Sequence, residues 1–170
     1  MTKIILVGYM GVGKTTIGNL LSKELNIPFF DLDQLIEQEV NTSINEIFAN
    51  KGEIWFRKKE HEVLHKFLKV QKNYILSLGG GTPCYANNHH VLQQQEIVSI
   101  YLRARVATLV SRLRLEAAHR PLIKANLDDL SSYIGPHVLE RSYYYNFSKL
   151  KLDVDSLSLD EIIADIRSML

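Results

Sequence analysis

The sequence predicts an α/β protein, a three-layer αβα sandwich in which helices cover both faces of a parallel β-sheet. Two observations predict it: short apolar runs alternate with helical patterns along the chain, and these runs are apolar at nearly every position. Strands buried on both faces, as in a helix-covered parallel sheet, have that composition. With 170 residues, 46% of them hydrophobic, the chain can bury one substantial core, so we expect a single domain over 1–170.

Each expected element follows from its own pattern. Uniformly apolar runs predict strands at 3–8, 28–31, 74–78, 97–102 and 150–154. Apolar residues at helical spacing predict helices at about 14–25, 53–70, 104–116, 127–148 and 158–169. Two stretches, about 33–61 and about 112–125, are expected as insertions on a core of about 1–32, 62–111 and 126–170. The second is rich in arginine and lacks a sustained apolar face, which favours a mobile lid.

A glycine-rich segment separates the first expected strand from the first expected helix. Residues 8–15 read Gly-Tyr-Met-Gly-Val-Gly-Lys-Thr, which matches the pattern G-x-x-x-x-G-K-T. The glycines allow successive backbone N–H groups to converge on a phosphate, and the helix adds its positive N-terminal end. Lys14 can then reach the β- and γ-phosphates, while the Thr15 hydroxyl can bind Mg²⁺. The segment therefore predicts a nucleotide-phosphate site.

The composition excludes several other classes of protein. Lys and Arg total 20 against 19 Asp and Glu, a net charge of +1, which gives no electrostatic case for binding nucleic acid or an anionic membrane. The one cysteine, Cys84, excludes an intrachain disulfide. No apolar run approaches the ~20 residues of a membrane span, and a strand begins at once where a secretory signal would lie. We expect a cytoplasmic protein, with a monomer as the default.

One carboxylate falls on the apolar stripe of the helix expected at 53–70. Glu60 lies in the middle of that stripe, where an unpaired charge would be costly, and Arg57 lies one turn earlier as its natural partner. The pair can be a buried ion pair that only fixes packing. Alternatively, Glu60 holds Arg57 rigid so that its guanidinium faces an anionic group of a substrate. Its position next to a phosphate site favours the second interpretation.

Polar and glycine residues follow the second and third expected strands. Asp31 and Asp33 end the second strand, and Gly79, Gly80 and Gly81 follow the third. Ligands of open parallel sheets bind beyond the carboxyl ends of the strands. One aspartate can act near Mg²⁺ and the other on substrate hydroxyls, while the glycines permit close approach of a ligand. The alternatives are helix capping by Asp33 and a simple wide turn at the glycines.

A second motif competes with the phosphate loop. Residues 61–65 read His-Glu-Val-Leu-His, the H-E-x-x-H pattern of zinc metalloproteases. On the helical wheel His61 lies at the edge of the buried stripe and His65 points further toward solvent. A zinc site also needs a third ligand, for which no downstream residue is arranged. We therefore expect solvated helix residues here.

These segments together resemble the shikimate kinases, a family of small P-loop kinases related to the nucleoside monophosphate kinases. The matching residues are 8–15, Phe-Asp-Leu-Asp at 30–33, Phe-Arg-Lys-Lys-Glu at 56–60, Leu-Gly-Gly-Gly at 78–81, Arg-Pro-Leu at 120–122 and Arg-Ser-Tyr-Tyr-Tyr at 141–145. The resemblance runs in order over nearly the whole chain. It implies the P-loop NTPase fold, with a five-stranded parallel sheet in the order 2-3-1-4-5. It also implies transfer of the ATP γ-phosphate to the 3-hydroxyl of shikimate.

The resemblance assigns a role to each candidate residue. It implies ATP contacts from residues of the phosphate loop and from two arginines of the lid region: Gly11, Val12, Gly13, Lys14, Thr15, Thr16, Arg112 and Arg120. Arg120 would bridge the phosphates and the acceptor, and Arg112, or else Arg114, would stack on adenine. Mg²⁺ would be bound by Thr15, by Asp31 through water and, more weakly, near Ser77.

On the acceptor side, the resemblance implies that the insertion at about 33–61 binds shikimate. Arg57 and Arg141 would clamp its carboxylate, Glu60 would orient Arg57, and Gly79 to Gly81 would line the pocket. Asp33 would bind the substrate hydroxyls and accept the attacking proton. Lys14, Asp33 and Arg120 would therefore be the catalytic residues.

Two other functions remain open from the residues alone. A kinase for another small hydroxy acid, such as gluconate, would share the phosphate loop and could use the same arginine pair. The pairing of F-R-x-x-E with three glycines favours a ring acid. A nucleotide-binding module without turnover is the second alternative, but it would have no need of an acceptor site.

Overall fold

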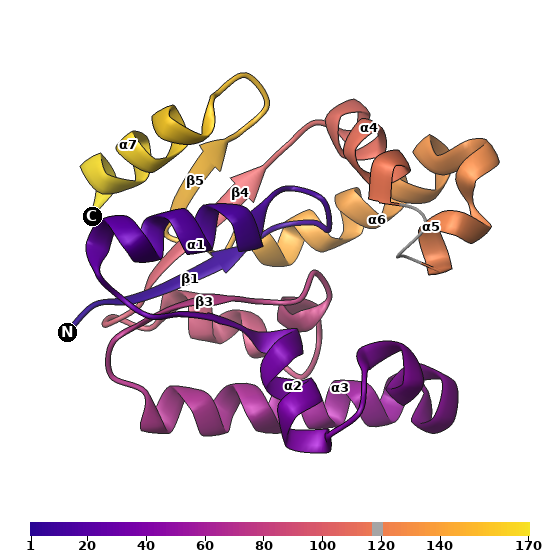
Figure 1. Cartoon of the computed structure of the whole chain (residues 1–170), viewed down its shortest axis with the longest axis horizontal. Coiled ribbons are helices and arrows are strands. Elements are labelled where there is room, and N and C mark those ends of the chain that lie inside the picture. The colour runs from indigo at the N-terminus through magenta and orange to yellow at the C-terminus, as the bar shows by residue number, and fades with distance from the viewer. Residues whose placement is uncertain (117–120) are drawn as a thin grey trace.

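A five-stranded, all-parallel sheet forms the centre of the computed structural model, which describes residues 1–116 and 121–170 (Figure 1). The strands are β1 (Lys3–Val7), β2 (Phe29–Asp31), β3 (Tyr74–Ser77), β4 (Val98–Arg103) and β5 (Leu150–Asp153). Their order is β2-β3-β1-β4-β5, which confirms the predicted topology. All five expected strands are present, and no strand end differs from the prediction by more than one residue.

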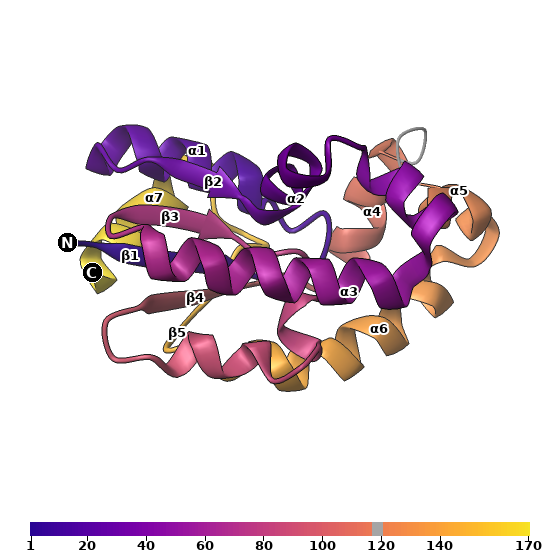
Figure 2. The same cartoon turned by 90° about the horizontal axis from the view of Figure 1, so that it is seen from below.

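Helices cover both faces of this sheet. They are α1 (Lys14–Leu25), α2 (Leu32–Val40), α3 (Ile44–Val70), α4 (Val106–Glu116), α5 (Pro121–Ala125), α6 (Leu130–Tyr145) and α7 (Leu159–Met169). Helix α1 packs with α7 on one face, whereas α3 and α6 lie on the other (Figures 1 and 2). The predicted three-layer sandwich is therefore confirmed. Short 3₁₀ segments occur at Thr82–Cys84, Asn88–Gln93 and Leu127–Asp129.

The long helix α3 begins earlier than the sequence pattern predicts. Ser43 caps it in a reciprocal arrangement with Glu46, whose carboxylate accepts from the Ser43 backbone N–H at 3.2 Å. Gly52 then bends the helix with φ of 79°, a left-handed value that favours glycine. The bend breaks the helical periodicity, so the spacing of apolar residues predicts a helix only from residue 53 onward. The stretch expected as an insertion thus consists of α2 and the first part of α3.

The expected lid at about 112–125 is described only in part. Its described portions are the end of α4 and the short helix α5, while residues 117–120 lie outside the described residues. Among the helices that are described, none combines the length and apolar character needed to cross a bilayer.

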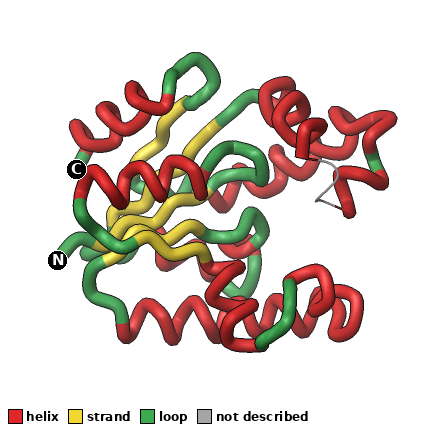
Figure 3. Tube along the Cα trace, viewed as in Figure 1, coloured by secondary structure: helices red, strands yellow, loops and turns green. Residues whose placement is uncertain are grey.

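The sheet gathers the functional segments at one edge. Its central strands are fully buried: Ile4, Ile5, Leu6 and Val7 of β1 are each at most 1% exposed. Because all strands are parallel, the loops after β1 and β3 emerge side by side at the carboxyl edge (Figure 3). The start of α2 follows β2 at the same edge, and both chain termini lie at the opposite end of the molecule (Figure 1).

Candidate active site

The loop after β1 has the strand–loop–helix context that the sequence predicts. Gly13 precedes α1 with φ of 104°, so α1 begins at Lys14 and its N-terminal end faces the loop. The Lys14 ammonium donates to the carbonyl oxygens of Gly8 at 2.8 Å and Tyr9 at 3.2 Å. The lysine therefore lies across the loop. From there its ammonium group can contact an anion that is bound by the backbone amides of the loop.

Helix α4 supports this loop from one side. Leu113 packs directly over Gly11, where an added Cβ would lie 2.9 Å from the leucine Cγ. Arg112 Nη1 donates to the carbonyl oxygen of Val12 at 3.0 Å, so the guanidinium is held beside the loop. Arg114 is exposed. Arg120 is the predicted site residue that falls outside the described residues.

Oxygen ligands suited to Mg²⁺ lie at the mouth of the loop. Thr15 Oγ1 donates to Asp31 Oδ2 at 3.2 Å, and Ser77, at the end of β3, lines the same cavity. Mg²⁺ is usually held by one or two protein oxygens together with substrate phosphates and water, so this pair fits the ion. Within 1–116 and 121–170, no group of three or more His, Cys, Asp or Glu side chains forms a metal site of its own.

Asp31, and not Asp33, caps helix α2. Asp31 Oδ1 accepts from the backbone N–H of Asp33 at 3.0 Å, so the predicted alternative of capping by Asp33 is wrong. The residue that enters the helix from an extended backbone makes the cap, and that residue is Asp31 because α2 begins at Leu32. The carboxylate of Asp33 is left to point into the cavity.

Asp33 is held in an electrostatically unfavourable position. Burial above all, together with the negative charges of Asp31 and Glu60, raises its pKa to about 6, although Lys14 and Arg57 oppose the shift. A carboxyl with a pKa near 6 is still mostly ionised at pH 7 to 8 but binds a proton more readily than an ordinary aspartate. That is a property of carboxylates that act as general bases.

A cavity of about 260 Å³ connects these groups. It is lined by loop and helix residues after β1, by the two aspartates after β2 and by glycines after β3: Gly11, Gly13, Lys14, Thr15, Thr16, Asp31, Asp33, Gly79 and Gly80. Glu116, at the end of α4, also lines the cavity and was not singled out from the sequence. Most of the nucleotide-side residues that the structure describes therefore line this one cavity. Val12 and Arg112 contact each other beside the loop, where the Val12 carbonyl accepts from the guanidinium.

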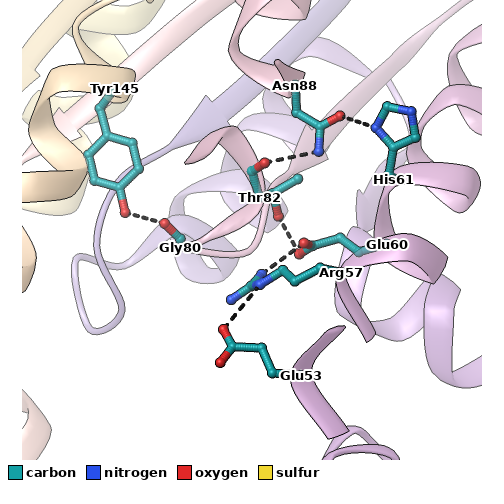
Figure 4. Close-up of polar contacts among 8 residues, drawn as sticks. All are labelled: Glu53, Arg57, Glu60, His61, Gly80, Thr82, Asn88 and Tyr145. Carbon is teal, nitrogen blue, oxygen red and sulfur yellow. Dashed lines mark hydrogen bonds and ion pairs between the residues drawn. The ribbon is translucent and has the colours of Figure 1, made fainter. Parts of the chain in front are cut away.

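The predicted pair of Glu60 and Arg57 is present (Figure 4). Glu60 is fully buried, and its Oε2 lies 2.8 Å from Arg57 Nη1. Arg57 also meets Glu53, whose Oε1 lies 3.5 Å from the guanidinium Nε. Burial alone would lower the pKa of Arg57, but the two carboxylates more than offset it and raise that pKa. The guanidinium is thus fixed in direction and permanently charged.

Each of the three glycines after β3 makes room for a functional side chain. A Cβ on Gly79 would lie 3.2 Å from Asp33 Oδ1, and one on Gly80 would lie 3.2 Å from Arg141 Nη1. A Cβ on Gly81 would come within 2.8 Å of Arg57 Cζ. The glycines therefore do more than form a wide turn, because any side chain there would displace a charged group.

Arg57 and Arg141 line a second cavity, of about 470 Å³, to which Gly81, Cys84 and Tyr85 also contribute. Arg57 belongs to α3 and Arg141 to α6, so two different helices supply the cations of this cavity. The Arg141 guanidinium lies 5.5 Å from the centre of the Tyr9 ring, in the range of a cation–π contact.

Two tyrosines in the site were not assigned a role from the sequence. Tyr9 is the residue under Arg141, and Tyr145 donates its hydroxyl to the Gly80 carbonyl at 2.5 Å. Both tyrosines are buried. Their position inside matched motifs was the available signal, since Tyr9 belongs to the phosphate loop and Tyr145 follows Arg141 by one helical turn.

His61 and His65, which the sequence predicts as solvated helix residues, are half-exposed, and both also contact Asn88. Their ring nitrogens, His61 Nδ1 and His65 Nε2, lie 2.7 and 3.3 Å from the Asn88 side-chain oxygen. The helical wheel of α3 could not show this contact, because Asn88 belongs to another element, the 3₁₀ segment Asn88–Gln93. The pair is thus engaged in a contact between two elements.

Comparison with known proteins agrees with this geometry. A family model described as shikimate kinase matches residues 10–170. A shikimate kinase of Flavobacterium psychrophilum is 49% identical over 172 aligned residues, which cover 100% of this chain and 99% of that protein.

Solved structures show the same likeness. The shikimate kinase of Bacteroides thetaiotaomicron superimposes with a TM-score of 0.91 at 29% identity, covering 99% of this chain and 97% of that one. A shikimate kinase of Acinetobacter baumannii in complex with shikimate gives a TM-score of 0.88 at 28% identity, covering 99% and 92%. Family match, identity and coverage together show that this chain belongs to the shikimate kinase family.

Proposed function

We propose that this chain transfers the γ-phosphoryl group of ATP to the 3-hydroxyl of shikimate, a step in the synthesis of chorismate and the aromatic amino acids. The observation that carries the proposal is the position of the three glycines after β3. Gly79 and Gly80 line the cavity of the phosphate loop, and Gly81 lines the cavity of Arg57 and Arg141. A donor and an acid acceptor would therefore meet across this turn.

The nucleotide side of the proposal rests on the loop after β1. The backbone amides of Gly11, Val12 and Gly13 and the N-terminal end of α1, with Thr16 in its first turn, would hold the phosphates. Lys14 would contact the β- and γ-phosphates. When bound, Mg²⁺ held by Thr15 and, through water, by Asp31, with Ser77 nearby, would neutralise charge on those phosphates. Arg112, fixed beside the loop, would contact the adenine.

The acceptor side rests on the second cavity. Arg57 and Arg141 would bind the shikimate carboxylate from two directions, with Glu60 keeping the Arg57 guanidinium in place. This arrangement would leave the ring hydroxyls toward Asp33 and the phosphate loop. Arg120 of the lid would bridge the phosphates and the acceptor.

The chemistry needs alignment and charge more than covalent help. The 3-hydroxyl oxygen would attack the γ-phosphorus while the bond to the β,γ-bridging oxygen breaks and ADP leaves. The hydroxyl proton would pass to Asp33, which the raised pKa suits for that task. Lys14 and Arg120 would stabilise the negative charge that spreads over the transferring group. Closure of the lid would exclude water, which would otherwise accept the phosphoryl group.

Two other functions are less well supported. A gluconate kinase could use the phosphate loop, but the family match over 10–170 favours shikimate. A module that only binds nucleotide would not explain the two arginines at the second cavity. We further propose that the protein works in the cytoplasm as a monomer.

The acceptor assay tests the proposed function directly. We expect ADP release from ATP and Mg²⁺ to rise at least a hundredfold on addition of shikimate, because only a bound acceptor completes the site. Gluconate, a nucleoside monophosphate and water alone serve as the matched arms. Stimulation by gluconate in place of shikimate, or equal rates in every arm, would contradict the proposal.

Substitution at Gly81 tests the acceptor side. Gly81→Ala keeps a backbone that alanine tolerates, since φ is −96°, but its Cβ would collide with the Arg57 guanidinium. We expect the shikimate KM to rise about tenfold or more, with the KM for ATP changed less than about twofold, because Arg57 is displaced from the carboxylate. Gly135→Ala on α6, where a Cβ meets nothing within 4 Å, is the control and should leave both constants unchanged. An unchanged shikimate KM in Gly81→Ala would remove Arg57 from the acceptor site.

Asp33→Asn separates catalysis from stability. The pKa of Asp33 is about 6 in the folded protein against an ordinary value of 3.8, so the fold favours the protonated form. The stabilisation from that form is fully present below pH 3.8 and is lost as the pH rises through 6. Asparagine stays neutral, so Asp33→Asn should be more stable than the wild type by about 1–3 kcal/mol at pH 8, and by less at pH 5.

The same variant should lose about 10²-fold or more in turnover, since the proton acceptor is gone. Urea unfolding at the two pH values and steady-state kinetics measure the two effects. Asp160→Asn, at an exposed position of α7, is the control for general charge removal. A change in the free energy of unfolding of Asp33→Asn that is the same at both pH values, in either direction, would contradict a buried, unfavourably ionised Asp33.

A further inference from the structure

A chain of buried hydrogen bonds continues behind the Glu60–Arg57 pair (Figure 4). Glu60 is fully buried, and each of its oxygens receives one donor. Oε2 accepts from Arg57 Nη1 at 2.8 Å, and Oε1 accepts from Thr82 Oγ1 at 2.6 Å. The hydroxyl of Thr82 is thus the second group that fixes the direction of the carboxylate.

Thr82 itself is held from behind. It follows the three glycines, is fully buried, and its carbonyl accepts from Asn88 Nδ2 at 3.0 Å. Asn88 is also fully buried. Because a carbonyl can only accept, this bond fixes the orientation of the Asn88 amide and turns its oxygen toward α3.

The far end of this series of hydrogen bonds contacts α3 again. The Asn88 oxygen faces His61 Nδ1 at 2.7 Å and His65 Nε2 at 3.3 Å. An amide oxygen cannot donate, so each histidine donates from the nitrogen that faces it. This series of hydrogen bonds therefore begins and ends on α3, at Glu60 and at the histidine pair. The segment after β3 that carries Thr82 and Asn88 connects the two ends.

We propose that Thr82, held in place by Asn88, is a positioning residue for acceptor binding. It acts through Glu60, whose carboxylate sets the direction in which the Arg57 guanidinium faces the second cavity. The inference rests on the proposed function, in that the acceptor is the carboxylate that Arg57 binds. Thr82 is fully buried and does not line the second cavity, so it would not contact the acceptor itself.

The physical reason lies in the burial of Glu60. Without the Thr82 hydroxyl, one carboxylate oxygen would stay buried without a donor, which is costly. The carboxylate would then rotate to share the Arg57 guanidinium between both oxygens, and less of the guanidinium would face the acceptor. Glu53 cannot compensate, because its side chain is 69% exposed and meets Arg57 at Nε, on another edge.

Paired substitutions at Thr82 test the inference. Thr82→Val keeps the shape of the side chain and removes the hydroxyl, whereas Thr82→Ser keeps the hydroxyl. We expect Thr82→Val to raise the shikimate KM on the order of tenfold, with kcat and the KM for ATP within about twofold of wild type. Thr82→Ser should stay within about twofold in all three constants. Thr2→Val, directly before β1 and at the end of the molecule opposite the site, is the control for loss of a threonine hydroxyl (Figure 1).

A merely structural role would give another pattern. It would lower the active fraction, and so kcat, in Thr82→Val while leaving the shikimate KM unchanged, and that result would overturn the inference. If Thr82→Val does not fold, Thr82→Ala removes the same hydroxyl and its KM values are read in the same way.

A double-mutant cycle shows whether Thr82 acts through Arg57. In an Arg57→Ala background, Thr82→Val should change kcat/KM for shikimate less than about twofold, because the group that it positions is gone. A loss that stays tenfold in that background would overturn the route through Arg57. Wild-type enzyme that shikimate does not stimulate would refute the proposed function, whereas an active wild type with a normal Thr82→Val would refute this inference alone.

Discussion

The candidate acceptor site depends on the two hydrogen bonds that the buried Glu60 carboxylate accepts, one from Arg57 and one from Thr82. A carboxylate without exposure to water is tolerated only where its oxygens have donors, and here one donor comes from its own helix and the other from the turn after β3. The Glu60 carboxylate therefore fastens α3 to that turn through the Thr82 hydroxyl. It also leaves a guanidinium fixed beside Gly81, at the wall of the second cavity.

The parallel sheet places this fastening next to the phosphate loop. The turns after β1 and β3 leave the same edge, and β2 ends there with Asp31 and Asp33. The charges then divide in space: Lys14 belongs to the loop, and Arg57 and Arg141 line the second cavity. Asp33 lines the cavity of the loop, near enough to both Lys14 and Arg57 for their charges to lower its pKa. Burial above all, and to a lesser extent repulsion from Asp31 and Glu60, raises the pKa of Asp33. The same burial and repulsion that cost stability make this aspartate a better proton acceptor.

Most of the fold could be predicted from the sequence, because buried parallel strands and amphipathic helices leave strong local patterns. The phosphate loop and the pairing of Glu60 with Arg57 were also readable, since both depend on residues close together in the chain. Contacts between distant segments were not. The contacts of the two histidines with Asn88 join α3 to the 3₁₀ segment Asn88–Gln93, and the helical wheel of α3 alone could not show them. The capping of α2 by Asp31 depends on where the helix begins, which periodicity locates only to within a few residues.

The most direct test of the account is a crystal structure of this protein with shikimate and a non-hydrolysable ATP analogue. We expect the shikimate carboxylate to lie about 3 Å from the guanidinium groups of both Arg57 and Arg141. The 3-hydroxyl should face Asp33 and the terminal phosphate of the analogue. A carboxylate bound at the loop after β1, or one that contacts neither arginine, would contradict the account.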